Sequence, residues 1–316
     1  MTAASERVAT PSDRFVAVEG GQLFVRRWRA PECAAGAAPL LLLHDSLGSV
    51  ALWRHFPASL ALTLRREVIA YDRLGFGRSS VRHARPGADF IEHEARCVLP
   101  ALADALGLER YALLGHSVGG GMALVAAALH PARCERVVSI AAQAFVEPRT
   151  RAAVRAARAR YAMPGPMQRL SRWHGDRAAW VVDAWTGTWL ARDFAGWCLD
   201  PWLPRIACPV LALHGDRDEF GSVAFPLRIV ARAGGDARML LLRDCGHVPH
   251  RERAAATLAA IAAFADVAPR WFRPEPASPP ARPGRTRAGI ARSRPHRRWP
   301  WPGCPTASPR GGRRPR

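Results

Sequence analysis

Ser117 lies between two glycines in the segment GHSVG (residues 115–119). The segment follows the apolar run YALL (111–114) and precedes small and apolar residues (118–130), which predicts a sharp turn from a strand into a helix. A serine on such a turn exposes its hydroxyl near the positive end of the helix, so it is a candidate nucleophile. The alternatives are a phosphate-binding loop and a serine that only caps the helix.

The phosphate-binding alternatives do not fit this sequence. A P-loop requires a lysine that meets the phosphates, and all 46 basic residues of the chain are arginines. A dinucleotide-binding turn requires the spacing G-x-G-x-x-G, whereas the glycines here stand at positions 115, 119, 120 and 121. The missing lysine also excludes Ser-Lys nucleophiles and Schiff-base chemistry.

A nucleophilic serine needs a base, and the base needs an acid that orients it. Two apolar runs downstream, 209–215 and 237–246, are each followed by suitable side chains. These are Asp216, Asp218, Glu219, His247 and His250. Because the carboxyl ends of parallel strands meet at one edge of a sheet, we expect these groups near Ser117. The chain order serine, acid, histidine is the order known for this kind of turn.

Strand-like and helix-like runs alternate along most of the chain, which predicts an α/β fold. We expect a mainly parallel sheet with helices on both faces and an antiparallel hairpin at its start. The strand-like runs are 14–28 (the hairpin), 39–44, 67–72, 110–116, 136–142, 209–215 and 237–246. The amphipathic runs between them are 51–64, 90–106, 118–130, 223–233 and 251–265.

A long interval between the runs that end near 142 and begin at 209 interrupts this rhythm. It has helical patterns of its own and holds six of the 11 tryptophans, namely Trp173, Trp180, Trp185, Trp189, Trp197 and Trp202. We therefore expect a core of residues 13–142 and 209–266 and an inserted helical cap of residues 143–208. Residues 1–12 are expected to be a flexible N-terminus.

The net charge of +20 is concentrated at the C-terminus. Residues 267–316 hold 13 arginines against the single acid Glu275, together with 12 of the 27 prolines, so we expect a disordered tail. Biased codon usage explains such a composition; a nucleic-acid or membrane-surface role for the tail is the alternative. We expect no nucleic-acid binding by the core, no membrane span and a cytoplasmic location, since no signal-like or spanning segment is present.

Five stretches together resemble the α/β-hydrolase superfamily over residues 13–265. In chain order they are LLLLHDSLGS, AYDRLGFGRSS, LLGHSVGGG, LALHGDRDEFGS and DCGHVPHRE. The resemblance implies a serine nucleophile at Ser117, an acid in a G-x-x-D pattern at Asp218 (with Asp216 in reserve) and a base in a Gly-His pair at His247. It implies no metal and no organic cofactor. His250 is expected to support the loop or line the entrance.

The resemblance also implies an oxyanion hole made by the backbone N–H groups of Val118 and Ser46. Members of the family usually have His-Gly at the second of these turns, whereas this chain has His44-Asp45. Asp tolerates left-handed backbone angles, so the turn can form. Its negative charge would hinder catalysis unless the side chain points away or pairs with an arginine.

The inserted segment occupies the position of a cap over the site. Trp185 and Trp189 are spaced to share a helix face and, with His116, are expected to line the substrate pocket. The alternative is that the tryptophans only attach the cap to the body. Arginines 151, 155 and 158 form one helical stripe, either a solvated face or a carboxylate clamp.

The sequence therefore predicts a serine hydrolase that cleaves a carboxylic ester or similar acyl bond of a small, apolar or aromatic molecule. A carbon–carbon hydrolase of ring-cleavage products, or a related lyase, could use the same triad. A non-catalytic ligand-binding protein is a third hypothesis. The sequence does not define the oligomeric state.

Overall fold

The computed structural model describes residues 8–34 and 36–266, all of which belong to one structural unit, Met1–Phe272. The expected tail, 267–316, lies outside the described residues. Of the expected flexible N-terminus, 1–12, only residues 1–7 lie outside the described residues. Its last three residues instead begin the first strand, because Thr10 to Ser12 pair with Arg29 to Arg27 on the neighbouring strand.

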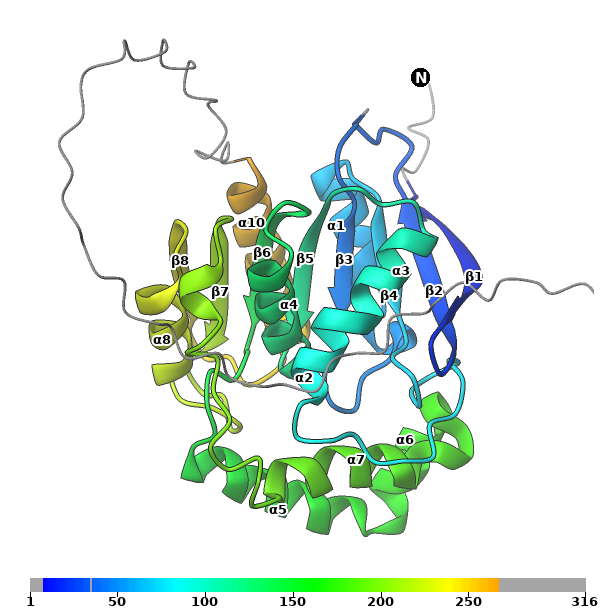
Figure 1. Ribbon diagram of the computed structural model, residues 1–316, viewed down its shortest axis with the longest axis vertical. Coiled ribbons are helices and arrows are strands. Elements are labelled where there is room, and N and C mark those ends of the chain that lie inside the picture. The colour runs from blue at the N-terminus through cyan, green and yellow to red at the C-terminus, as the bar shows by residue number, and fades with distance from the viewer. Residues whose placement is uncertain (1–7, 35, 267–316) are drawn as a thin grey trace, which may run out of the picture. The chain divides into compact units, whose positions relative to one another are not determined.

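Eight strands form one sheet in the order β1-β2-β4-β3-β5-β6-β7-β8 (Figure 1). β1 pairs antiparallel with β2 and β2 with β4, whereas all other neighbours are parallel. The bounds are β1 Thr10–Val18, β2 Gly21–Arg29, β3 Leu40–Leu43, β4 Val68–Tyr71, β5 Tyr111–His116, β6 Cys134–Ile140, β7 Val210–Gly215 and β8 Ala237–Leu242. The expected hairpin is present between β1 and β2.

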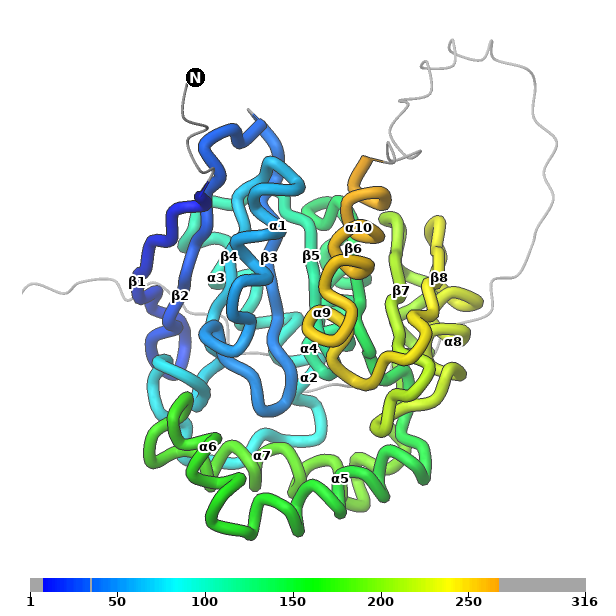
Figure 2. The backbone as a smooth tube through the Cα atoms, turned by 180° about the vertical axis from the view of Figure 1, so that it is seen from behind, coloured from blue at the N-terminus to red at the C-terminus, as the bar shows by residue number. Residues whose placement is uncertain are grey.

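Helices cover both faces of this sheet. Figure 1 shows α2, α3, α4 and α8 in front of it, and the view from behind in Figure 2 shows α1, α9 and α10 on the other face. The bounds are α1 Phe56–Leu64, α2 Phe90–His93, α3 Leu99–Ala105, α4 Val118–Leu129, α8 Ala224–Arg232, α9 Pro249–Glu252 and α10 Ala254–Ala265. A short helical turn, η1 (Val50–Trp53), precedes α1. A second one, η2 (Glu94–Val98), joins α2 to α3.

Two apolar cores explain this layering. One packs α3 and α4 against one face of the sheet, and the other packs α1 and α10 against the opposite face. The central strands β3, β4, β5 and β7 are buried along their whole length, as continuous apolar runs predict. The predicted fold class is confirmed. β8 differs, because it is an edge strand that leaves Leu240 and Leu241 more than one-third exposed.

The segment between β6 and β7 is helical and lies across the carboxyl end of the strands (Figures 1 and 2). It comprises α5 (Pro148–Tyr161), α6 (Pro164–His174), η3 (Gly175–Arg177), α7 (Ala178–Leu190) and η4 (Leu203–Arg205). Contacts with the body attach it at both ends. Thr150 donates a hydrogen bond to the carbonyl of Phe220, and the indole N–H groups of Trp197 and Trp202 donate to Glu92.

Within residues 8–34 and 36–266, no helix is long and apolar enough to cross a membrane.

Candidate active site

Ser117 occupies a strained turn between β5 and α4. Its backbone angles are φ 55° and ψ −124°, a region that non-glycine residues rarely adopt. The turn requires both flanking glycines. A Cβ at Gly115 would collide with the backbone of Gly119, and a Cβ at Gly119 would collide with the carbonyl oxygens of Leu43 and His44 at the end of β3. The sequence therefore brings α4 against β3 and places Ser117 at the carboxyl end of the central strand β5.

A chain of hydrogen bonds connects the serine to a buried carboxylate. The Oγ of Ser117 lies 2.9 Å from Nε2 of His247, and Nδ1 of His247 lies 2.9 and 2.8 Å from the two carboxylate oxygens of Asp218. All three residues are at most 9% exposed. Asp218 also accepts a 2.7 Å hydrogen bond from the N–H of Phe220, which fixes the carboxylate. The structure thus brings together the three residues predicted to form a triad.

The charges within this chain of hydrogen bonds reinforce one another. Burial alone would lower the pKa of His247, but the carboxylate of Asp218, with Glu219 and Asp45, outweighs burial and raises the pKa of the imidazole above its usual value. Burial would likewise raise the pKa of Asp218, and the charge and hydrogen bond of His247 lower it instead. Asp218 therefore remains ionised, and its charge favours a protonated His247.

The other acid and base candidates have different surroundings. Asp216 accepts a hydrogen bond from the N–H of Cys245, so it holds the neighbouring loop and does not reach His247. His250 is 5% exposed and packs against the rings of Trp53 and His116. Burial lowers the pKa of His250 well below the usual range for histidine, so it is a neutral packing residue behind the site.

Glu252, an acid that the sequence analysis did not single out, holds the loop that carries His247. The carboxylate of Glu252 accepts hydrogen bonds from the N–H groups of Gly246 (2.6 Å) and Val248 (2.9 Å), on both sides of His247. This double contact fixes the backbone from which the imidazole projects. Its position, five residues after the histidine, could have suggested this role.

The two predicted oxyanion residues come from different elements. Val118 is the first residue of α4, where backbone N–H groups have no acceptor within the helix. Ser46 lines the cavity described below, on the turn that follows β3. Arg73 fixes this turn by donating a 2.7 Å hydrogen bond from its guanidinium to the backbone carbonyl of Asp45.

The carboxylate of Asp45 pairs with a histidine rather than with an arginine. It lies 3.2 Å from Nδ1 of His116 and accepts a 3.0 Å hydrogen bond from the N–H of Leu47. Burial would raise the pKa of Asp45, but its hydrogen bond to His116 and the nearby histidine charges lower it strongly. Asp45 is therefore an anion beside the turn that carries Ser46, and His116 is its partner.

His116 does not line the cavity above Ser117, in contrast to the expectation from sequence. Its Nε2 lies 2.7 Å from the backbone carbonyl of His247, and its Nδ1 faces Asp45. The side chain is 2% exposed, because these two contacts turn the ring into the protein. Both ring nitrogens face oxygen atoms, and these two contacts join the Asp45 turn to the His247 loop.

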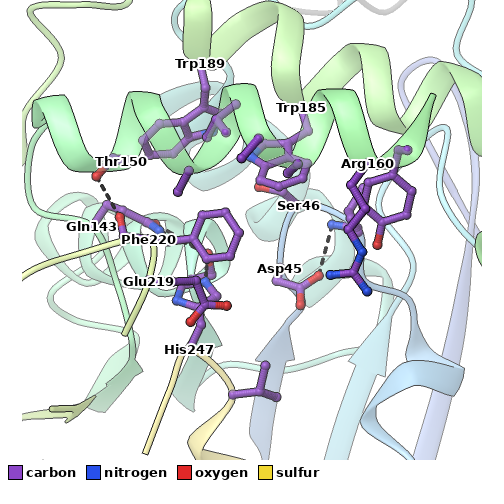
Figure 3. A pocket seen from close by; sticks show the side chains of 18 residues that line it. Asp45, Ser46, Gln143, Thr150, Arg160, Trp185, Trp189, Glu219, Phe220 and His247 are labelled. Carbon is purple, nitrogen blue, oxygen red and sulfur yellow. Dashed lines mark hydrogen bonds between the residues drawn. The ribbon is translucent and has the colours of Figure 1, made fainter. Parts of the chain in front are cut away.

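A cavity of about 420 Å³ opens above Ser117 and His247 (Figure 3). Most of its wall comes from α5, α7 and the loop after β7, and it is mainly apolar. Trp185, Trp189, Phe220, Val154, Ala157 and Val248 form the apolar wall. Both predicted pocket tryptophans thus line the cavity. The indole N–H of Trp189 is buried and has no hydrogen-bond partner among the described residues.

Other polar side chains also line this cavity, and of these only Glu219 was among the candidates taken from the sequence. The amide of Gln143 lies 3.3 Å from the Oγ of Ser117, and Glu219, Arg160 and Tyr161 also line the wall. Gln143 directly follows the apolar run that ends at 142, and a polar residue at that strand end could have suggested a site position. The position of Arg160 depends on how α5 is oriented, which the sequence pattern does not specify.

Among the residues that the structure describes, no group of three or more His, Cys, Asp or Glu side chains is arranged to hold a metal ion.

Comparison with known proteins relates this geometry to one family. A family model described as alpha/beta hydrolase fold matches residues 38–254. Solved structures of proline iminopeptidase from Mycobacterium smegmatis and of the enol-lactonase from Burkholderia xenovorans LB400 superpose with TM-scores of 0.62 and 0.60. The iminopeptidase is 24% identical in sequence, and its alignment covers 80% of this chain and 97% of the iminopeptidase chain. The enol-lactonase is 22% identical, and its alignment covers 79% of this chain and 99% of the lactonase chain. At these identities the likeness concerns the fold.

Curated relatives match over shorter stretches. The putative carbamate hydrolase RutD of Caulobacter segnis is 38% identical over 106 residues, 34% of this chain and 38% of the relative. The 2-hydroxymuconate semialdehyde hydrolase of Pseudomonas sp. (strain CF600) is 37% identical over 103 residues, 32% and 35% of the two chains. Human 1-acylglycerol-3-phosphate O-acyltransferase ABHD5 is 34% identical over 109 residues, 34% and 31%. The matches thus span about a third of each relative.

Proposed function

Because the chain belongs to the alpha/beta hydrolase fold family, we propose that it is a serine hydrolase that cleaves a carboxylic ester or similar acyl bond. The observation that carries the proposal is the unbroken series of hydrogen bonds from Ser117 through His247 to Asp218. A serine hydroxyl becomes a nucleophile when an oriented base accepts its proton, and this arrangement supplies both base and orientation.

In the first half of the reaction, Oγ of Ser117 attacks the carbonyl carbon while Nε2 of His247 takes the hydroxyl proton. The carbonyl oxygen becomes an oxyanion, which the N–H groups of Val118 and Ser46 are proposed to bind. His247 then gives the proton to the leaving alcohol oxygen as the bond from that oxygen to the carbonyl carbon breaks. The acyl group remains on Ser117, and Asp218 stabilises the protonated imidazole during both transfers.

In the second half, water attacks the acyl carbon and gives a proton to His247. The imidazole returns this proton to Oγ of Ser117 when the serine–acyl bond breaks, which releases the carboxylic acid and restores the enzyme. We propose that the segment 143–208 acts as a cap over this chemistry. Its tryptophans Trp185 and Trp189, together with Phe220, form an apolar wall suited to a small apolar or aromatic acyl or alcohol group.

Labelling with a fluorophosphonate, followed by intact-mass measurement, tests the proposal. We expect one adduct on the wild-type chain and none on Ser117→Ala or His247→Ala, with ester hydrolysis lost in the same two variants. Ser46→Ala is a matched serine control in the same cavity, because its proposed contribution is a backbone N–H that alanine retains. Labelling of Ser117→Ala at the wild-type rate, or no labelling of folded wild type, would contradict the proposal.

A carbon–carbon hydrolase is the second candidate, favoured by the similarity of 32% of the chain to the 2-hydroxymuconate semialdehyde hydrolase. The same serine, base and acid could serve cleavage next to a carbonyl group. Turnover of a vinylogous 1,5-diketone at a rate well above that of 4-nitrophenyl butyrate would support this candidate. The reverse order of rates would support the esterase.

A further inference from the structure

We propose that the substrate carries a carboxylate or phosphate group and that an arginine-lined groove beside the cavity binds it. This inference rests on the proposed hydrolase function and adds the class of substrate. The groove has a volume of about 240 Å³. It shares four lining residues with the cavity above Ser117, namely Asp45, Leu47, Arg160 and Tyr161, so the two spaces adjoin.

Three arginines from three separate elements meet at this groove. Arg160 comes from the last turn of α5, Arg169 from α6, and Arg251 from α9, four residues after His247. Arg251 donates one hydrogen bond to the backbone carbonyl of Leu52. Arg160 and Arg169 form no ion pair with any residue in the described part of the chain. Figure 3 shows Arg160 on the same side of the cavity as Asp45.

The negative charge already present does not neutralise this cluster. Asp45 is the acid that lines the groove, and its carboxylate pairs with His116 at 3.2 Å. Among the described residues, no arginine side chain lies within ion-pair distance of that carboxylate. The groove therefore keeps an excess of positive charge next to the proposed oxyanion turn. Guanidinium groups bind carboxylate and phosphate through paired hydrogen bonds, which makes an anionic substrate group the natural occupant.

The rest of the groove is suited to an anion on an apolar scaffold. Leu52, Leu170 and Trp173 line it together with Tyr161. Burial raises the pKa of Tyr161, so its hydroxyl stays protonated and can donate a hydrogen bond to an anionic oxygen.

The arginine stripe noted in the sequence faces elsewhere. Arg151, Arg155 and Arg158 line a separate shallow depression with Leu190 and no residue of the triad. Arg151 donates hydrogen bonds to the carbonyls of Trp189, Leu190 and Ala191, so it holds the end of α7. Of the arginines on α5 that line these spaces, Arg160 is the one that reaches the cavity.

Two matched pairs of esters test the proposal, one for each side of the scissile bond. Mono-4-nitrophenyl glutarate against 4-nitrophenyl pentanoate places the anion in the acyl part, and 4-butyryloxybenzoate against phenyl butyrate places it in the alcohol part. We expect kcat/KM to favour the anionic member by about tenfold or more in at least one pair, as charged hydrogen bonds contribute. This preference should fall to within about threefold in Arg160→Gln and Arg169→Gln, and should weaken as salt concentration rises.

Arg155→Gln is the matched control, since it removes an arginine from the outer face of the same helix and should keep the preference. Equal kcat/KM for both members of each pair, or a preference that survives both groove substitutions, would overturn the inference. Hydrolysis of the neutral esters that depends on Ser117 would then still support the proposed function.

A binding measurement keeps the test independent of turnover. In Ser117→Ala, calorimetry should show mono-4-nitrophenyl glutarate binding about tenfold more tightly than 4-nitrophenyl pentanoate, and Arg160→Gln in this background should remove the difference. Equal affinities would overturn the inference even if no ester were hydrolysed. An analogous pair with a phosphate in place of the carboxylate would show which of the two anions is preferred.

Discussion

The imidazole of His247 lies between a hydroxyl and a carboxylate, and in the proposed mechanism its protonation decides when Ser117 can react. Only the neutral ring can accept a proton from Ser117. Because Asp218 raises the pKa of His247, kcat/KM for a neutral ester should rise with pH through a midpoint above 6.5. In Asp218→Asn the raising charge is gone and burial remains, so the midpoint should move lower.

The rate in Asp218→Asn should fall by about 10³–10⁴, as when the orienting acid of such a triad is replaced. A pH–rate series on both proteins measures the midpoint and the rate. Asp216→Asn is the matched control on the same loop and should keep the wild-type rate to within about twofold, because an amide oxygen can still accept the bond from Cys245. A similar loss in both variants would contradict the assignment of Asp218.

His116 has a separate role at the residue scale, since its Nδ1 lies 3.2 Å from the carboxylate of Asp45 and holds that carboxylate in place. In His116→Gln the amide can still donate to the carbonyl of His247, but the contact with Asp45 is lost. The free carboxylate would then oppose the oxyanion near Ser46. We expect kcat to fall by about 10–100-fold, the value of one hydrogen bond to a charged group, with little change in KM.

The double variant Asp45→Asn/His116→Gln separates electrostatics from folding. Without the Asp45 carboxylate, the loss of its contact with His116 should no longer matter. The kcat of the double variant should therefore recover to within about threefold of that of the single variant Asp45→Asn. Steady-state kinetics on the four proteins of this cycle measures the coupling. A loss that persists in the double variant would show that His116 acts only through the fold.

At the scale of elements, the close approach of α4 to β3 positions Ser117, the proposed nucleophile. In Gly119→Ala the new methyl group would meet the carbonyls of Leu43 and His44, which belong to backbone and cannot turn aside. We expect a stability loss of about 1–3 kcal/mol and a large loss of activity, because the turn of Ser117 must shift. Thermal or denaturant unfolding and ester kinetics measure the two effects.

Gly121→Ala is the matched control two residues along the same helix. There the added Cβ would lie 3.6 Å from the ring of Trp197, an ordinary contact. Alanine also has the higher helix propensity, so stability should be kept or slightly increased and activity retained. Equal damage from both substitutions would indicate that helix α4 as a whole, rather than its contact with β3, is sensitive.

At the scale of the whole molecule, some structural features could be predicted from the sequence and others could not. The order of strands and helices was predictable because apolar runs of strand length alternate with amphipathic runs, and this pattern is local. The approach of Ser117, Asp218 and His247 was predictable because strand ends meet at one sheet edge. The inward turn of His116 was not, since it depends on two partners, Asp45 and His247, that are distant in sequence.

The arginines show the same limit for a helix. Helical spacing groups Arg151, Arg155 and Arg158 on one side of α5 but does not say which side faces the cavity. The rotation of α5 is set by tertiary contacts such as Thr150 with Phe220 and Arg151 with the end of α7. The arginine that faces the site, Arg160, is therefore known only once the segment has packed onto the body.

Residues 267–316 hold 13 arginines and one acid, so most of the net charge of +20 lies outside the part of the chain that forms the proposed site. Helix α10 ends at Ala265, where Arg136 donates 2.7 Å hydrogen bonds to the carbonyls of Phe264 and Ala265. This cap closes the helix from within the described residues. A chain of residues 1–266 should therefore keep ester hydrolysis to within about twofold and unfold at a similar temperature.

Arg136→Gln in the shortened chain tests the reason for this expectation. Loss of the two charge-assisted hydrogen bonds should lower the free energy of unfolding by about 1.5–3 kcal/mol. The kcat of the folded fraction should not change, because the proposed triad is distant. If the shortened chain with Arg136 intact lost activity but kept its unfolding temperature, residues 267–316 would have to contribute to substrate binding. In that case the arginine-rich segment would add to the preference for anionic substrates that we propose for the groove of Arg160 and Arg169. The paired esters would then show a smaller preference for the anionic member in the shortened chain than in the full chain.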